Sequence, residues 1–219
     1  MNRTKKLLSA MIAVLMIAGC SSRDPQTEEP AADTETPESP DETSSSVRFC
    51  DPSVFEGFDH FTTVSGDTEI TIGDSAFSAL GDLPVVHVTQ LQGLGQTGKT
   101  DPETLDPGAL GRILIDSFAK SGLPVMIRVY NPYDTPAAPA DCLIIGVENN
   151  DGIIFSNGIR YDSGLEEYTA LLGEPSGISG EVYFWCDENQ AHIVNVQVKN
   201  GETSLLSYMN LTAVQKQLP

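Results

Sequence analysis

One stretch of this sequence matches the pattern of a loop that could bind phosphate. Residues 93–100 read Gly-Leu-Gly-Gln-Thr-Gly-Lys-Thr, which matches the pattern G-x-x-x-x-G-K-T. In a loop of this type the backbone N–H groups surround the phosphates of a nucleotide, and the lysine, here Lys99, contacts the β- and γ-phosphates. An apolar run that ends in an acidic residue, Ile113 to Asp116, follows as a magnesium-binding segment would. Together these residues could therefore bind a nucleotide.

The residues after Thr100 argue against a phosphate site. The loop amides hold a phosphate only where a helix begins at the end of the loop and packs on a parallel sheet. Pro102, Pro107 and Gly108 follow within eight residues of Thr100, and prolines interrupt a helix because they lack the N–H donor. We therefore interpret residues 93–100 as an exposed Gly/Thr loop and keep nucleotide binding as an alternative.

No other catalytic or metal-binding group can be selected from spacing alone. His60, His87 and His192 have no neighbours at the spacing of metal ligands, and no serine lies in the turn pattern of a hydrolase nucleophile. Carboxylates are too numerous for one pair to stand out, so an envelope hydrolase that uses them is the alternative to a binding protein. The sequence predicts no catalytic residue, no metal site and no cofactor. It leaves open whether the protein is an enzyme and favours a non-enzyme.

The residues around Cys20 carry a signal for covalent modification. Ile17 lies three positions before the cysteine with two small residues between, an arrangement that resembles the lipobox of bacterial lipoproteins. Upstream, three cations precede an apolar run of about 12 residues, shorter than the roughly 20 of a membrane-spanning helix. We predict that residues 1–19 are a signal peptide and that Cys20 carries diacylglyceryl and palmitate-like chains. The lipid would anchor the protein at the extracytoplasmic face of the cell membrane.

The segment after Cys20 is acidic and contains nothing that could form a core. Residues 21–46 contain eight carboxylates and one arginine among Ser, Thr and Pro, a composition that predicts a disordered linker. Loss of the three cations of the signal peptide changes the net charge from −19 to −22. Because no segment of the mature chain collects Lys or Arg, we exclude nucleic acid and anionic lipid headgroups as partners.

Three cysteines remain once Cys20 is assigned to the lipid, and an odd number cannot all form pairs. Cys142 and Cys186 lie in apolar runs, where a cysteine behaves as a small hydrophobic residue. The spacing to Cys50 gives no Cys-x-x-Cys pattern for zinc or redox chemistry. Whether any two of these residues pair stays open.

Alternating apolar residues predict antiparallel strands over most of the remaining chain. The run 112–118 also fits a helical face, and we favour a strand because its apolar stretch is short and β-branched. Asn149 to Gly152 and Asn200-Gly201 are turn sequences that join hairpin strands, and residues 76–80 are expected to form a helical turn. The predicted strands are 69–72, 85–91, 112–118, 125–130, 142–147, 181–186, 191–199 and 203–208.

The clearest helix signal begins at Ser163. Ser163 and Glu166 have the spacing of a capping box, in which each side chain satisfies a free N–H of the first turn. Gly173 and Pro175 end this helix after about ten residues. A helix this short must pack on a sheet to be stable. The apolar stripe that would do so consists of Leu165, Tyr168, Leu171 and Leu172.

The strand at 181–186 supplies the one candidate binding surface. Tyr183 and Trp185 lie on the same side of this strand, and a sheet covered by a single helix would leave one aromatic pair uncovered. We expect the pair to pack against the other half of the protein or, as the alternative, to bind a partner. His192 shares the face of the valines of the next strand and is expected at the edge of the core.

A short internal repeat indicates two related halves. Residues 77–81 and 168–173 each carry an aromatic residue followed by Ala, Leu and Gly, and each follows a short strand. The order of strand, short helix and antiparallel meander is similar to the βαββ unit of SmpA/OmlA-type envelope lipoproteins and of β-lactamase inhibitor protein. Segments within residues 69–200 resemble uncharacterised tandem-unit lipoproteins of Gram-positive anaerobes: Val129 to Pro132, Asp141-Cys142, and Gly158-Ile159 leading into Tyr168 and Leu172 to Pro175. The segment 92–108 departs from that pattern.

The sequence thus predicts an α+β fold of antiparallel sheets with short helices, arranged as two βαββ-like units after a disordered tether. The expected parts are a signal peptide (1–19), a lipidated cysteine with its linker (20–48), a first unit (49–149) and a second unit (150–219). The resemblance implies a non-catalytic binding or assembly module at the cell surface, whose partner is an envelope protein or an exported ligand.

Overall fold

The computed structural model describes residues 47–63, 69–82, 84–92, 96–116, 125–148 and 152–216. The predicted signal peptide, Cys20 and the acidic linker up to residue 46 lie outside these residues. Among the residues that are described, no helix has both the length and the apolar composition that crossing a bilayer requires.

Short strands and short helices make up the fold. The helical elements are η1 (Pro52–Phe58), η2 (Phe77–Leu80), η3 (Pro139–Asp141), α2 (Leu165–Leu172) and α3 (Thr212–Gln215). The strands are β1 (His60–Thr63), β2 (Glu69–Thr71), β3 (Val85–Gln92), β4 (Gln96–Thr100), β5 (Leu110–Ile115), β6 (Val125–Tyr130), β7 (Leu143–Glu148), β8 (Ile153–Phe155), β9 (Gly177–Ser179), β10 (Val182–Cys186), β11 (His192–Lys199) and β12 (Glu202–Asn210).

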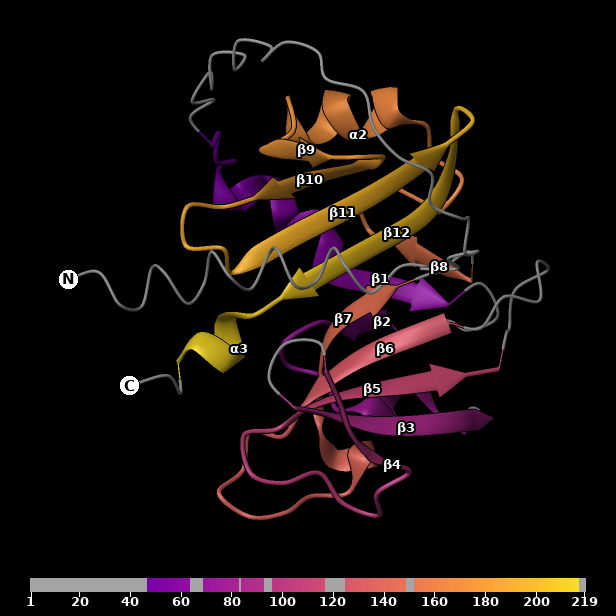
Figure 1. Cartoon of the computed structure of the whole chain (residues 1–219), viewed down its shortest axis with the longest axis vertical. Coiled ribbons are helices and arrows are strands. Elements are labelled where there is room, and N and C mark those ends of the chain that lie inside the picture. The colour runs from indigo at the N-terminus through magenta and orange to yellow at the C-terminus, as the bar shows by residue number, and fades with distance from the viewer. Residues whose placement is uncertain are drawn as a thin grey trace, which may run out of the picture.

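One antiparallel sheet runs through both halves of the chain. Its nine strands lie in the order β4-β3-β5-β6-β7-β12-β11-β10-β9, and Figure 1 shows it twisting from β9 to β4. The halves meet where β7 pairs with β12, with Tyr208 opposite Val147. Since β7 precedes residue 149 and β12 follows it, strands of both predicted units belong to a single sheet.

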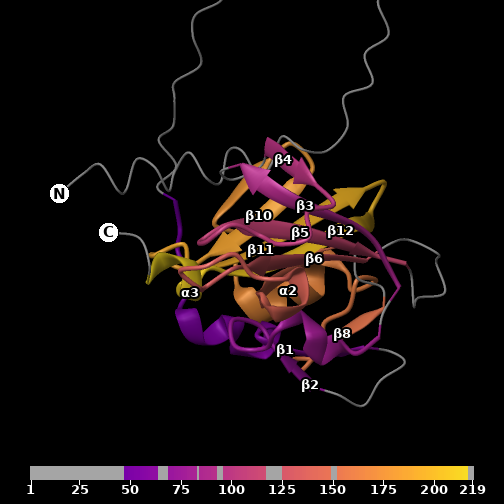
Figure 2. The same cartoon turned by 90° about the horizontal axis from the view of Figure 1, so that it is seen from below.

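A small sheet and the helix α2 cover one face of the large sheet. The small sheet has the order β2-β1-β8, so it also joins distant parts of the chain. Figure 2 shows α2, β1 and β8 on the same side of the large sheet. In the core between these layers, the ring of Tyr208 lies 5.4 Å from that of Phe58 and 6.1 Å from that of Phe155. This aromatic cluster joins η1, β8 and β12.

The strands predicted from alternation are all present, with ends that shift by a few residues. In the ambiguous run 112–118, residues 112–115 belong to strand β5, in which Ile113 and Ile115 are fully buried whereas Leu114 lies on the other face, and residues 117–118 lie outside the described residues. Four short strands, β1, β4, β8 and β9, were not predicted. They have three to five residues, too few for an alternation pattern to be distinctive.

The predicted helix is present, but its cap and its buried face differ from the prediction. The N-cap is Gly164, and Glu167 takes the role assigned to Glu166: its carboxylate accepts hydrogen bonds from the Ser163 hydroxyl (2.9 Å) and the Gly164 N–H (3.5 Å). In the predicted stripe, Leu172 is 5% exposed whereas Leu171 is 37% exposed. The helix therefore packs through Tyr168 and Leu172.

Trp185 lies in the core, so the alternative that it forms a binding surface is wrong. Its side chain is fully buried, its ring lies 6.2 Å from that of Tyr168, and its Nε1–H donates to the carbonyl oxygen of Gly173 (2.8 Å). Tyr183, on the same face, is half-buried against this core. Trp185 thus packs against α2 of its own half, and both residues of the pair belong to or contact a core cluster to which both halves contribute.

One predicted turn closes a hairpin and the other does not. Asn200 (φ 53°) and Gly201 (φ 84°) have the left-handed conformation of a tight turn and connect β11 to β12. Asn149 to Asp151 lie outside the described residues, and the strands on either side, β7 and β8, belong to different sheets. β7 and β8 therefore do not form the predicted hairpin.

Candidate functional site

A cleft of about 360 Å³ opens where three distant segments of the chain meet. The segments are the end of η1, the turn after β2, and the end of β12 with α3. The cleft is lined by Asp59, His60, Thr71, Ile72, Gly73, Asp74, Asn210, Thr212, Ala213 and Lys216. Most of these side chains are polar, so the cleft suits a ligand that forms hydrogen bonds or carries charge.

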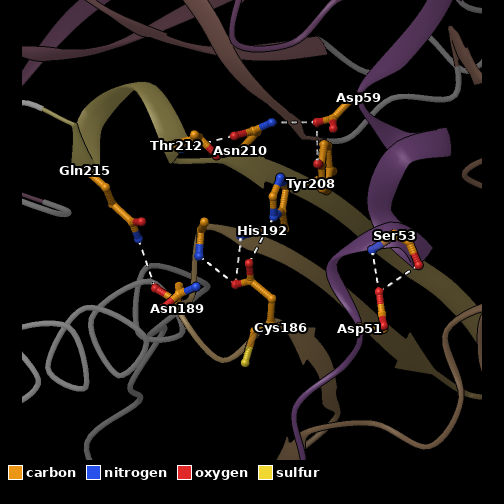
Figure 3. A network of polar contacts seen from close by, with 12 residues as sticks. Asp51, Ser53, Asp59, Cys186, Asn189, His192, Tyr208, Asn210, Thr212 and Gln215 are labelled. Atoms are coloured by element: carbon orange, nitrogen blue, oxygen red, sulfur yellow. Dashed lines mark hydrogen bonds and ion pairs between the residues drawn. The ribbon is translucent and has the colours of Figure 1, made fainter.

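Asp59 is the most firmly positioned of the charged groups in the cleft. Its Oδ1 accepts a hydrogen bond from the Tyr208 hydroxyl (2.6 Å) and another from Nδ2 of Asn210 (2.7 Å), as Figure 3 shows. Both donors are buried, so they cannot turn away to water. Among the described residues, Oδ2 of Asp59 has no hydrogen-bond partner.

The sequence around Asp59 explains how its backbone is held. In η1, the side chain of Asp51 accepts from the Ser53 N–H (2.9 Å) as an N-cap, and buried Phe55 and Phe58 attach this turn to the core. The carbonyl oxygen of Asp59 then accepts from the Ile72 N–H (2.7 Å). These contacts fix the position of the Asp59 side chain.

The opposite wall of the cleft comes from the end of β12. Tyr208 and Asn210 are two residues apart, so they lie on the same face of the strand. Oδ1 of Asn210 accepts from the Thr212 N–H (3.0 Å) and starts α3, which places Lys216 at the cleft. Gly73, with φ 95°, completes the floor and donates its N–H to the Ile144 carbonyl (2.6 Å).

The electrostatics keep Tyr208 in its donor form. Burial, followed by the charge of Asp59, raises the pKa of the Tyr208 phenol far above its ordinary value. The phenol therefore keeps its proton at neutral pH and continues to donate to Asp59.

His60 lies in the same cleft but lacks the geometry of a catalytic base. Its Nδ1 lies 3.2 Å from the Thr71 hydroxyl and 3.5 Å from a Glu69 carboxylate oxygen. In a hydrolytic triad, the hydroxyl and the carboxylate contact different ring nitrogens, because one accepts a proton while the other is held. Here both neighbours contact the same nitrogen, so the three residues cannot act as a triad.

The phosphate-loop lookalike is a strand where it is described, and the interpretation of residues 96–100 as a loop is wrong. Residues 96–100 form β4, with Thr100 opposite Thr89 of β3. The Lys99 ammonium donates to both carboxylate oxygens of Asp106, each at 2.8 Å. Lys99 and then Gln90 lower the pKa of Asp106. The lysine is therefore paired with a carboxylate, and the described residues 100–116 that follow it contain no helix.

The other two histidines are paired with carboxylates outside the cleft. Nδ1 of His87 lies 2.8 Å from Asp101, and Nδ1 of His192 lies 3.1 Å from the buried Asp187. His192 also stacks on Phe55 with its ring 5.6 Å away, which confirms its predicted place at the edge of the core. No three His, Cys, Asp or Glu side chains gather as a metal site in the part of the chain that is described.

Two of the cysteines behave as the sequence predicts. Cys142 and Cys186 are fully buried among apolar side chains, and Cys50 is partly buried. All three are free thiols in this structure, and burial raises the pKa of each.

Comparisons with protein-family models, with curated proteins and with solved structures find no match. The candidate site therefore rests on its geometry. Sequence reasoning did not select Asp59 or Asn210. The only local signal is that Asn210 precedes a short helix as a cap would, and nothing in the sequence connects it to an aspartate about 150 residues earlier.

Proposed function

We propose that this protein is a non-catalytic binding or assembly module, held at the outer face of the cell membrane by a lipid on Cys20, and that its partner contacts the Asp59 cleft. The observation that carries the proposal is the carboxylate of Asp59. Two buried donors fix Oδ1, while Oδ2 has no partner among the described residues. A carboxylate held in this way is ready to accept a donor from another molecule without reorganising.

The chemistry of the cleft favours a partner that presents a cation. Asp59 and Asp74 contribute two carboxylates, and Lys216 contributes one ammonium. The net charge of −19 attracts a cationic partner over longer distances. A lysine or arginine side chain of an envelope protein, or an exported ligand with an amine, satisfies both conditions. Arginine fits best because its planar guanidinium donates in parallel to a carboxylate.

Binding is better supported than catalysis because the cleft lacks an activated group. His60 contacts its hydroxyl and carboxylate neighbours through one nitrogen. Asp59 is already occupied on one oxygen by Tyr208 and Asn210. The arrangement orients a carboxylate and provides no pair of groups that could transfer a proton in sequence.

The test compares Asp59→Asn with Asp82→Asn, an exposed carboxylate outside the cleft. Each full-length variant is titrated with N-acetyl-arginine amide by NMR and used for quantitative recovery of partners from detergent-solubilised envelope. We expect Asp59→Asn to weaken binding of the arginine probe by about tenfold or more, since a charge-assisted hydrogen bond is lost. Asp82→Asn should behave as the unmodified protein does. Equal binding by both variants, with unchanged melting temperatures, would contradict the proposal.

We also infer that the two halves share one strand–helix–meander plan. Gly81 ends η2 with φ 81° and ψ −163°, and Gly173 ends α2 with φ 79° and ψ −165°. Each glycine follows a strand of the small sheet and its helix, and each precedes strands of the large sheet. The matching conformations support the tandem βαββ-like description.

A further inference from the structure

A row of polar side chains crosses the face of the large sheet that points away from the Asp59 cleft. Arg112 of β5 lies directly opposite Arg128 of β6, and Thr89 of β3 lies directly opposite Arg112. Residues paired in this way lie on one face, with Cβ atoms about 5 Å apart. Ile127, the neighbour of Arg128, is fully buried in the core, so the arginines point the other way.

Two arginines directly opposite each other are unexpected in a protein with a large negative net charge. The chain has 12 Lys and Arg against 31 Asp and Glu, so most cations could be surrounded by carboxylates. Like charges directly opposite each other in a sheet are destabilising. Among the described residues, the carboxylate that contacts the pair is that of Glu148, whose Oε2 accepts from Nη2 of Arg128 at 2.9 Å. The row therefore keeps a net positive charge.

The row also has more donors than acceptors. Nε of Arg128 and Oγ1 of Thr89 are buried and have no hydrogen-bond partner within the described residues. For Arg112, no hydrogen bond or ion pair is found with any of the described residues. Buried polar groups usually have partners. The two buried atoms are closed to solvent, but the Arg112 guanidinium is partly exposed, so an acceptor from outside the protein can supply the partner that Arg112 lacks.

Apolar side chains lie beside the arginines. A small pocket of about 20 Å³ has Arg128 on one side and is otherwise lined by Leu91, Leu110, Gly111, Ile145, Met209 and Leu211. This volume holds about one water-sized group. Because the lining is apolar, a methyl group suits the pocket better than water does.

We propose that Arg112 and Arg128 bind the carboxylate of a short monocarboxylic acid whose aliphatic end enters this pocket. Guanidinium groups recognise carboxylates through parallel N–H donors. A single negative charge is favoured over a multiply charged anion, because the net charge of −19 repels the latter more strongly. The apolar lining selects an acid with an aliphatic body.

The test follows the arginine Nε–H signals of the full chain by NMR during titration with butyrate, acetate and inorganic phosphate. We expect saturable shifts of the Arg112 and Arg128 signals with butyrate, and weaker binding of acetate and of phosphate. Arg112→Gln should weaken butyrate binding by about tenfold or more. It should also raise the melting temperature without ligand, because the like-charge pair is removed. Lys199→Gln, which removes an exposed cation elsewhere, is the matched control.

Replacement of Arg128 alone would leave Glu148 unpaired, so the second variant is Arg128→Gln combined with Glu148→Gln, and it should also lose butyrate binding. No saturable shift with butyrate, butyrate binding unchanged in Arg112→Gln, or phosphate binding as tight as butyrate binding would each overturn the proposal. Asp59→Asn leaves this face untouched and should bind butyrate normally, so this proposal and the Asp59 cleft can fail separately.

Discussion

Burial gives individual polar residues of this protein hydrogen-bonding and acid–base properties that the neighbouring residues in the sequence do not indicate. Asn131 follows a strand and precedes Pro132, as many loop residues do, yet it is fully buried. Its Nδ2 donates to the carbonyl oxygens of Leu105, Asp106 and Thr135 at 3.0–3.1 Å. One amide thereby holds the proline-rich loop against the segment before β5. Asp59 is held in a similar way, because hydrogen bonds from two donors fix one of its carboxylate oxygens.

At the residue scale, Cys142 should make stability depend on alkaline pH. The thiol is fully buried, and burial raises its pKa from the ordinary 9.0 to about 11. Between these values the folded protein retains the proton and the unfolded chain loses it, so stability is complete below about pH 9 and falls as pH rises toward 11. Urea unfolding at several pH values measures this slope, and Cys142→Ala should reduce it. An unchanged slope in that variant would show that other groups cause it.

At the scale of elements, α2 shows how a short helix obtains its stability from packing. Gly164 and Glu167 cap it, and its eight residues are too few to form a stable helix alone. Tyr168 and Leu172 bury its inner face over Trp185, and the Tyr168 hydroxyl donates to the Arg160 carbonyl (2.9 Å). The helix and the strand beneath it therefore depend on each other.

Leu171 and Leu172 provide a matched pair for testing this dependence. Leu172→Ala should lower the free energy of unfolding by about 2–4 kcal/mol, because it leaves a cavity under α2. Leu171→Ala should change it by about 0.5 kcal/mol or less, as expected for a surface position. Denaturant unfolding of both variants gives the comparison. Equal losses at the two positions would mean that the helix packs through a different face.

The strand β4 leads to a prediction about nucleotide. Lys99 lies in a strand and is held by Asp106, and none of the described residues 100–116 after it forms a helix whose N-terminus could bind a phosphate. We expect calorimetry at millimolar ATP or GTP with magnesium to detect no binding. Lys99→Ala should melt at nearly the same temperature, since it removes an exposed ion pair. Saturable binding that disappears in this variant would contradict the assignment.

At the scale of the whole molecule, both halves of the chain contribute strands to each of the two sheets, and the protein is strongly acidic. The large sheet crosses the predicted boundary at residue 149 through the pairing of β7 with β12, so neither half contains a complete layer. The small sheet repeats this exchange by pairing β1 with β8. Truncation at that boundary would expose two strand edges and divide the common core.

The lipid anchor is a prediction for the molecule as a whole. Cys20→Ser should leave the protein unlipidated and uncleaved, because the thiol accepts the lipid and lipidation precedes cleavage in the pathway that the lipobox resembles. Mass spectrometry of the N-terminus of protein isolated from membranes measures both steps. A mature form of the unmodified protein that begins elsewhere and carries no lipid would exclude Cys20 as the anchor.

The sequence by itself determined the local elements. Alternation predicted eight of the strands, and the Asn200-Gly201 turn and the helix near Ser163 were found from side chains within a few residues of each other. The tertiary structure alone decided the Asp59 cleft, the burial of Trp185 and the opposition of Arg112 to Arg128. The physical reason is range: turns and periodicity depend on neighbouring residues, whereas sheet order and burial depend on contacts between residues far apart in the chain.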